Sequence, residues 1–245
     1  MVDRSFRDAA LAELYEALNP WGPGDDFYLD LVMSARAVLD AGCGTGRLLR
    51  RAREAGHTGR LTGLDPAAAM LVQARRATRD VEWVLGDLGT TWWEGRYDLV
   101  VMTGHAFQEL LGDEELRRSL AAVRRALAPE GAFVFETRAP AARAWESWTP
   151  DVIHEFRGPE GDVVRVWHEA ETPVHGDRVS FTETYDGPRW DEPQVCRSTV
   201  RFLDEAALDR FLDEAGLAVR RRFGDWERGP LTPACREIIT VAGRA

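Results

Sequence analysis

The sequence predicts an α/β fold built around a doubly wound, mostly parallel sheet. Patterns typical of strands and helices alternate up to about residue 138, as expected when helices cover both faces of such a sheet. The apolar run Val38–Leu39 and the acid Asp40 lead into a turn with alternate glycines, Gly42–Gly46, and then into a helical segment. A largely apolar run at 97–102 is typical of a strand buried on both faces.

The elements can be assigned in order along the chain. Leu11, Leu14 and Leu18 have helical spacing and predict one helix over 8–18, which turn-forming residues then end. A second helical segment is expected at 27–33. The core strands are expected at 37–40, 60–65, 81–85, 97–102 and 131–136, with helices at 47–55, 66–79 and 113–127 between them.

The pattern changes after residue 137. Residues alternate between apolar and polar in several runs, which predicts antiparallel strands joined by turns rich in Gly, Pro and Asp. These runs cover 151–156, 163–169, 178–185 and 195–202. A helix at 204–215 and two strands at 218–223 and 237–241 are expected to complete the fold.

The composition excludes several classes of protein. The 245 residues carry a net charge of −10, which disfavours a nucleic-acid partner because such binding depends on neutralising phosphates. All basic side chains other than histidine are arginine, so no lysine can serve as a base or Schiff base. Three scattered cysteines without a C-x-x-C pair favour a reducing compartment and disfavour a zinc site. No apolar run reaches the roughly 20 residues of a membrane span, and no signal peptide is evident, so we expect a cytoplasmic protein.

The glycine turn differs from two common nucleotide motifs. Arg47 stands where the dinucleotide fingerprint has its third glycine, and the G-K-[ST] of a P-loop is missing. Acids follow the first three strands at Asp40, Asp65 and Asp87. Ligands of such sheets bind beyond the carboxyl ends of the strands, and a carboxylate after the second strand can accept both hydroxyls of a ribose.

These motifs together resemble the class I S-adenosylmethionine-dependent methyltransferases of the small-molecule type. The resemblance implies a seven-stranded Rossmann-like sheet and an antiparallel β insertion that forms a roof over the acceptor site. It divides the chain into an N-terminal helical lid (1–36), a cofactor-binding core (37–138 and 199–245) and the insertion (139–198). The matching stretches are Leu39–Gly46, Gly63–Pro66 with Met70 and Leu71, Gly86 and Asp87, Tyr97–Val100, and Leu127–Phe133.

The resemblance also implies S-adenosylmethionine as the cofactor and S-adenosylhomocysteine as its product. Asp40 and the glycine turn would lie at the methionine end, and Asp65 would bind the ribose hydroxyls. The acids could instead be ordinary helix caps or turn residues. The full set of expected cofactor residues is Asp40, Gly42, Cys43, Gly44, Gly46, Leu64, Asp65, Met70, Gly86, Asp87, Leu88 and Thr103.

Methyl transfer from a sulfonium mainly requires that the acceptor be positioned and water excluded. A base is needed only where the acceptor must lose a proton. His105 lies in the segment after the fourth strand, where it could be that base, line the pocket or cap the next helix. Tyr15 resembles the lid tyrosine of small-molecule methyltransferases, but it could equally occupy an ordinary apolar position. Thr103 and Phe107 are expected to shape the pocket.

The insertion offers further candidates for contact with an acceptor. Arg138 could meet an acidic acceptor, although a salt bridge that fixes the insertion is the favoured alternative. His168 and Glu169 are adjacent and would face opposite sides of a strand, so we expect no metal site. Other polar candidates are His154, His168, Glu169, Glu183 and Arg201, and aromatic candidates are Trp145, Trp148, Trp167 and Trp190.

The sequence therefore predicts a bacterial-type methyltransferase that acts on an oxygen or nitrogen of a small metabolite. One alternative is an RNA or protein methyltransferase, which the acidic charge and the lack of an Asn/Asp-Pro-Pro-Tyr tetrapeptide after the fourth strand disfavour. Another is a cofactor-binding protein that transfers no methyl group. The acceptor and the oligomeric state, monomer or homodimer, stay open because fold does not determine substrate.

Overall fold

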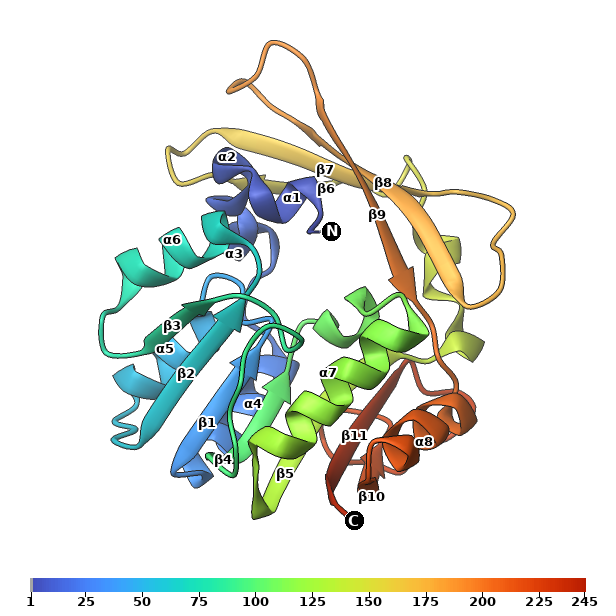
Figure 1. The fold of residues 1–245 in the computed structure, drawn as a ribbon. Helices are drawn as coiled ribbons and strands as arrows, with labels where there is room; N and C mark the ends of the chain where they lie inside the picture. The colour runs from blue at the N-terminus through green and yellow to red at the C-terminus, as the bar shows by residue number, and fades with distance from the viewer. Residues whose placement is uncertain (1) are drawn as a thin grey trace.

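A computed structural model describes residues 2–245 and contains a central seven-stranded sheet (Figure 1). The strand order is β10-β11-β5-β4-β1-β2-β3, in which β11 runs antiparallel to both of its neighbours and the other pairs are parallel. This arrangement confirms the predicted α/β class with a mostly parallel, seven-stranded sheet. The strands are β1 (Ala37–Ala41), β2 (Arg60–Asp65), β3 (Glu82–Leu85), β4 (Tyr97–Met102), β5 (Leu127–Arg138), β10 (Leu217–Phe223) and β11 (Glu237–Arg244).

Helices cover both faces of this sheet because adjacent residues of each strand point to opposite sides. On one face, Val38 and Val101 pack with α4 (Pro23–Ser34) and α5 (Arg47–Glu54). On the other face, the next residue of β1, Leu39, packs with α7 (Asp113–Ala126) and α8 (Glu205–Glu214). The helix α6 (Ala68–Ala77) lies against β2 and β3. Burial on both faces explains why these strands read as continuous apolar runs.

A second sheet of four antiparallel strands lies above the carboxyl edge of the central sheet (Figure 1). We call residues 139–201, which include this sheet, the roof. Its order is β6-β7-β8-β9, and it is preceded by two short 3-10 helices, η2 (Pro140–Ala142) and η3 (Ala144–Ser147). The strands are β6 (His154–Arg157), β7 (Val163–Ala170), β8 (Arg178–Asp186) and β9 (Gln194–Arg201).

One buried amide joins both ends of the roof to the core. Gln108 follows β4, and its Oε1 accepts hydrogen bonds from the backbone N–H of Arg138 (3.2 Å) and from its guanidinium (3.0 Å). The Nε2 of the same side chain donates to the carbonyl of Arg201 at 2.8 Å. The chain therefore leaves and re-enters the core at neighbouring points.

The predicted single helix over 8–18 is wrong. The segment forms two short helices, α2 (Ala9–Ala12) and α3 (Tyr15–Leu18), and a further short helix, α1 (Arg4–Arg7), precedes it. Asp8 starts a new helix because its side chain accepts the N–H groups of residues 10 and 11. A tight turn at Leu14 then separates α2 from α3, so that Leu11 and Leu14 pack against the roof while Tyr15 faces the core.

Strand β5 begins earlier than the predicted range of 131–136. Leu127 already pairs with Tyr97, and the register between β4 and β5 shifts before Leu99 pairs with Ala132. The residues between these two pairs include Pro129 and Gly131, which are typical of turns. The register shift accommodates them within the strand.

Gly46 lies at a tight contact in this core, and its substitution tests the packing. Its φ is +73°, and a Cβ there would overlap the ring of Trp83. We expect Gly46→Ala to lower the free energy of unfolding by about 2–5 kcal/mol, from left-handed strain together with overpacking. The control is Gly56→Ala, because Gly56 has φ +91° but open space around it, so only strain of about 1–2 kcal/mol applies. Urea unfolding of both variants measures the difference, and equal losses would contradict the packing role of Trp83.

Candidate active site

The glycine turn connects β1 to α5 at the carboxyl edge of the sheet. Its glycines have positive φ angles of 84° at Gly42, 54° at Gly44 and 73° at Gly46, which residues with a Cβ rarely adopt. A Cβ at Gly44 would meet nothing closer than Tyr15, at 3.9 Å. The backbone at Gly44 is therefore open toward Tyr15, whereas Gly46 is required by packing.

Asp65 fixes this turn to the end of β2. Its Oδ2 accepts the backbone N–H of Gly44 at 2.8 Å, and its Oδ1 accepts that of Ala67 at 2.7 Å. Burial raises the pKa of the carboxyl group, and these two hydrogen bonds oppose the rise. Each oxygen keeps lone pairs that a ligand hydroxyl could use.

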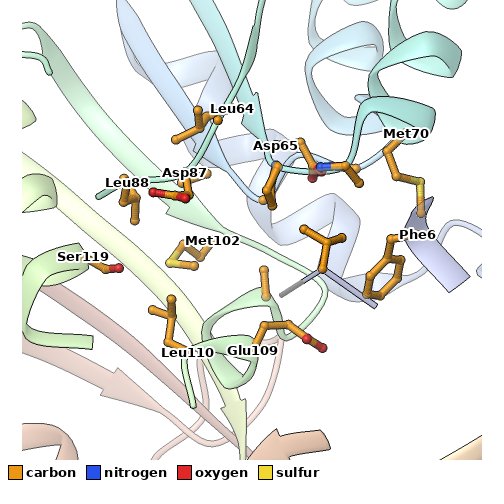
Figure 2. Close-up of a pocket in the computed structure, with 18 of the residues that line it drawn as sticks. Phe6, Leu64, Asp65, Met70, Asp87, Leu88, Met102, Glu109, Leu110 and Ser119 are labelled. Carbon is orange, nitrogen blue, oxygen red and sulfur yellow. The ribbon is translucent and has the colours of Figure 1, made fainter. Parts of the chain in front are cut away.

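A cavity of about 490 Å³ lies between the glycine turn, the loops after β2, β3 and β4, and the N-terminal helix α1. Figure 2 shows Asp87, Leu88 and Ser119 at one end of it and Phe6 and Met70 at the other. Asp65 and Glu109 reach it from different sides. A site of this size and mixed polarity suits a ligand of cofactor dimensions.

A second buried acid lies next to the cavity without a partner. Asp40 is 1% exposed, and its Oδ1 has no hydrogen bond to any described residue. Burial, with contributions from Asp65 and Glu136, raises the pKa of Asp40 to about 8. Glu136 is also buried, but it accepts hydrogen bonds from the Tyr28 hydroxyl and from the backbone N–H of His105. Asp40 thus presents an unsatisfied acceptor at the carboxyl edge, which is where a ligand donor would satisfy it.

The sequence of this chain is similar to those of known methyltransferases. A model described as a methyltransferase domain matches residues 38–131. Over its whole length the chain is 29% identical to the cypemycin N-terminal methyltransferase of a Streptomyces species, and the alignment covers 100% of both proteins. Residues 38–131 therefore form a methyltransferase domain.

Solved structures of methyltransferases share the fold of this chain. The CcbJ methyltransferase from Streptomyces caelestis superposes with a TM-score of 0.77 at 22% identity, covering 98% of each chain. CalS10 from Micromonospora echinaspora, an amino pentose methyltransferase solved with S-adenosylmethionine bound, gives a TM-score of 0.71 at 22% identity and covers 95% of this chain and 97% of its own. The roof is therefore included in the likeness.

Most of the residues expected to hold the cofactor line the cavity of the methyltransferase. They are Gly42, Gly44, Leu64, Asp65, Met70, Gly86, Asp87, Leu88 and Thr103. Asp40 lies beside the cavity, next to Ala41, which lines it. The side chain of Cys43 instead packs with Leu71 and Ala74 of α6. Cys43 and Gly46 thus contact the protein core on the side of the turn that faces away from the cavity.

Asp87 combines a turn role with a free oxygen. Its Oδ1 accepts the backbone N–H groups of Gly89 (2.8 Å) and Thr90 (2.9 Å), as expected for an aspartate that stabilises a turn. No hydrogen bond to a described residue involves its Oδ2, and the side chain lines the cavity (Figure 2). The turn role of Asp87 is therefore confirmed, and its Oδ2 is free to contact a ligand in the cavity.

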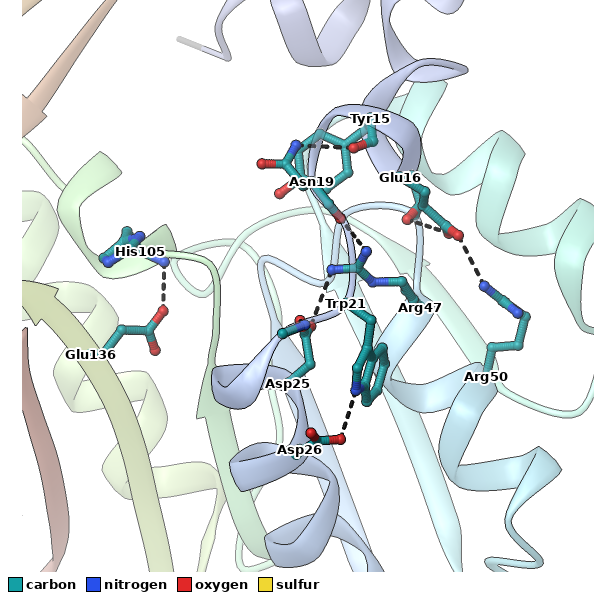
Figure 3. A network of polar contacts seen from close by, with 12 residues as sticks. Tyr15, Glu16, Asn19, Trp21, Asp25, Asp26, Arg47, Arg50, His105 and Glu136 are labelled. Carbon is teal, nitrogen blue, oxygen red and sulfur yellow. Dashed lines mark hydrogen bonds and ion pairs between the residues drawn. The ribbon is translucent and has the colours of Figure 1, made fainter. Parts of the chain in front are cut away.

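Arginines of α5 hold the N-terminal helices over the glycine turn (Figure 3). Arg47 donates to the carbonyl of Asn19 and to Asp25. Arg50 pairs with Glu16 at 2.9 Å, and the Thr45 hydroxyl donates to the same carboxylate at 2.8 Å. Arg47, which replaces the third glycine of the dinucleotide motif, thus connects the turn to the N-terminal segment.

Tyr15 lies in the wall of the cavity between the glycine turn and the segment after β4. A Cβ on Gly104 would come within 3.6 Å of its hydroxyl. Burial raises the pKa of Tyr15 to about 12, although Arg47 opposes the rise. The phenol is therefore protonated at neutral pH and can donate a hydrogen bond into the cavity.

His105 is held in an unusual conformation, and its ring turns away from the cavity. Its φ is +63°, and its backbone N–H donates to Glu136 at 2.7 Å. The ring Nε2 lies 3.0 Å from Oε2 of Glu237, at the start of β11. Gly104 and Ala106 on either side line the cavity, whereas His105 does not.

Two arginine candidates at the ends of the insertion are held by neighbouring side chains. Arg138 forms no ion pair with a carboxylate of residues 2–245; Gln108 holds it, and its guanidinium lies 5.7 Å from the ring centroid of Trp148. Arg201 is buried and paired with Asp113 (2.7 Å) and Asp177 (2.6 Å), so it has a structural role.

A second histidine–glutamate pair lies in the roof. His168 and Glu183 face each other across β7 and β8 at 3.1 Å, while Glu169 pairs with Thr182 and points to the opposite side. His154 lies exposed on β6. Trp145 and Trp148 pack against Phe202 in an apolar cluster.

The sequence motifs missed several residues that line the cavity. Phe6, Glu109 and Ser119 contribute to its wall from α1, from η1 (Ala106–Glu109) and from α7. Phe6 and Ser119 have no spacing that could single them out. Glu109 carried one weak signal, since it belongs to the same segment after β4 as the candidate His105.

No helix among residues 2–245 is both long and apolar enough to cross a bilayer. The same residues contain no group of three or more His, Cys, Asp or Glu side chains arranged to hold a metal ion.

The buried acid Asp40 predicts a pH-dependent stability. A carboxyl group with a raised pKa stabilises the fold fully below the unfolded pKa of about 4, and this contribution is lost as the pH rises toward the folded value, about 8. We therefore expect Asp40→Asn to melt at a higher temperature than the wild type at pH 7–9, with a smaller difference at pH 5. Thermal unfolding without ligand measures it. The exposed helix cap Asp204→Asn serves as control and should show no such trend.

Proposed function

We propose that the chain transfers a methyl group from S-adenosylmethionine to an oxygen or nitrogen of a small-molecule acceptor. The observation that carries this proposal is the cavity bounded by the open glycine turn, Asp65 and Asp87, with the unsatisfied Asp40 beside it. When bound, the cofactor supplies an activated methyl group on a sulfonium. The chain's own contribution is to hold the two reactants together and to exclude water.

The residues around the cavity fit S-adenosylmethionine. We place the ribose at Asp65, whose oxygens keep free lone pairs, and the adenine near Asp87 and Leu88. Asp40 can accept the ammonium of the methionine end, because a buried carboxylate without a partner needs a donor. Gly44 lets the ligand approach the backbone, whereas a Cβ on Gly42 would overlap that of Ala106. Leu64, Met70, Gly86 and Thr103 complete the wall.

A small-molecule acceptor is supported by the relatives and by the charge. The relatives of this chain include a glycine/sarcosine N-methyltransferase from Halorhodospira halochloris and a sugar N-methyltransferase, KedS8, from Streptoalloteichus. The net charge of −10 opposes an RNA substrate. A peptide substrate is the second candidate, since the relative that matches the full chain is named as an N-terminal methyltransferase.

We also propose a division of labour along the chain. Residues 1–36 act as a lid, residues 37–138 and 199–245 bind the cofactor, and residues 139–198 cover the acceptor. The lid is supported by Tyr15, which lies over the glycine turn, and by Leu11 and Leu14, which pack against the roof. A cytoplasmic, bacterial setting is part of the same proposal.

The cofactor is tested directly by calorimetric titration of the purified protein with S-adenosylmethionine, S-adenosylhomocysteine and NAD. We expect binding of the first two and none of NAD. Binding of NAD alone would refute the assignment. Incubation with candidate acceptors, followed by mass analysis for a methyl increment, then separates a methyltransferase from a protein that only binds the cofactor.

Asp65→Ala tests the ribose site. We expect the affinity for S-adenosylmethionine to fall at least tenfold, about 1.4 kcal/mol, because the acceptor for the ribose hydroxyls is lost. Asp225→Ala is the matched control, since Asp225 also accepts two backbone N–H groups, from Glu227 and Gly229, but does not line the cavity. Affinity in the Asp65 variant equal to that of the control would exclude the ribose role.

His105→Ala tests whether the imidazole accepts a proton. Because the ring contacts Glu237 and does not line the cavity, we expect cofactor affinity to be unchanged and turnover to fall less than tenfold. General base catalysis typically contributes about 10²–10⁴-fold. A loss of turnover in that range, with normal cofactor affinity, would instead identify His105 as the base.

A further inference from the structure

We propose that Glu109 is a catalytic residue that binds an amino group of the acceptor and takes its proton before methyl transfer. The inference rests on the proposed function and makes it more specific, because it selects nitrogen over oxygen as the atom methylated. It identifies the acceptor class as a primary or secondary amine.

The position of Glu109 supports this role. It is the last residue of η1, in the same segment as Gly104 and Ala106, and it lines the cofactor-sized cavity together with Asp65 and Gly44. Figure 2 shows its side chain reaching the cavity from below, across from Asp65. No hydrogen bond to another described residue occupies its carboxylate.

Glu109 also lies where a second cavity meets the first. This second cavity, of about 240 Å³, is bounded by the N-terminal residue Asp3, by Leu111 and Glu115, and by Arg197 and Thr199 of β9 in the roof. Glu109 lines both cavities, so a molecule that entered beneath the roof would meet its carboxylate beside the cofactor-sized space.

The charges that face Glu109 come from every element around it. Asp3 before α1 and Glu115 of α7 are acidic, and Arg118 of α7 is basic. Arg138 of β5 acts on it from the sheet. Arg197 of β9 is already bound to Glu171 through two hydrogen bonds. The side chain of Glu109 is exposed to solvent in the cavity. Desolvation by the surrounding cavity walls, followed by Asp3, raises the pKa of Glu109 to about 7, and Arg138 opposes this rise.

The chemistry of such a carboxyl group discriminates between acceptors. An alkylammonium has a pKa of about 10, so a carboxylate with an elevated pKa can accept its proton at a modest energetic cost. The ammonium loses one proton to Glu109, and the lone pair that is freed on nitrogen forms the bond to the methyl carbon. The bond from that carbon to the sulfonium sulfur breaks at the same time, and its electron pair stays on the sulfur of S-adenosylhomocysteine. The neutral carboxyl group then returns the proton to water. An alcohol is far too weak an acid to be ionised by this group.

The first test measures the carboxyl group itself. Glutamate labelled with 13C at the carboxyl carbon is followed by NMR from pH 4 to 9 in the protein saturated with S-adenosylhomocysteine. We expect one glutamate to titrate near pH 7 and its signal to be missing in Glu109→Gln. The matched control is Glu114→Gln, because Glu114 is an exposed carboxylate of α7 that lines neither cavity, so the signal should persist. Titration of Glu109 in the ordinary carboxylate range, about 4–5, would overturn the proposal.

The second test compares amines with alcohols of the same skeleton as acceptors. The probes are glucosamine with glucose, and benzylamine with benzyl alcohol, scored by mass for a methyl increment. We expect methylation of amine and not of alcohol, a loss of at least 100-fold in Glu109→Gln, and a change of less than threefold in Glu114→Gln, with cofactor affinity retained in both. Wild-type rates in Glu109→Gln, or methylation of alcohols alone, would overturn the inference. If no probe reacts, the carboxyl titration decides.

The two proposals fail in different ways. If the wild-type protein does not bind S-adenosylmethionine, the proposed function fails. If it binds the cofactor and methylates an amine while Glu109→Gln does the same, only the role of Glu109 fails.

Discussion

Three acids meet at the carboxyl edge of the central sheet, and their burial constrains the rest of the site. Asp40, Asp65 and Glu136 are each at most 6% exposed, and no arginine forms an ion pair with any of them within residues 2–245. Asp65 is stabilised by the N–H groups of the glycine turn and of the following helix, and Glu136 by Tyr28 and His105. Only Asp40 lacks a complete set of partners. Burying three carboxyl groups with so few hydrogen-bond donors lowers the stability of the fold. A ligand that supplies the missing donors would offset this cost.

The hydrogen bonds of these acids also determine the shape of the surrounding loops. Asp65 fixes Gly44 and therefore the open face of the turn, and Glu136 holds His105 in a left-handed conformation that a histidine rarely adopts. Because the backbone reverses at His105, Gly104 and Ala106 face the cavity while the imidazole meets Glu237. A left-handed backbone conformation at a residue other than glycine persists only where neighbouring groups enforce it.

Much of the fold could be predicted from the sequence, since strands buried on both faces leave a clear apolar signal. The strand predicted at 60–65 is β2 to the residue, and the four alternating runs of the insertion are the strands of the roof. The N-terminal helix could not be predicted correctly, because its break depends on Leu11 and Leu14 packing against the roof, a contact between distant parts of the chain. The glycine turn and the acids after the strands indicated the cavity. The direction of the His105 ring and the place of Glu109 depend on tertiary contacts, for which local spacing carries no signal.

The amide of Gln108 has a consequence for how this protein can diversify. Because it binds the chain at Arg138 and again at Arg201, the intervening residues behave as a cassette with two neighbouring attachment points. Insertions whose ends lie close together are tolerated well, since the host core need not adjust to their length. A lineage could therefore replace or remodel the whole roof, and with it the preference for one acceptor over another, while the cofactor end stays unchanged. Substrate range and cofactor chemistry would then evolve as separable modules.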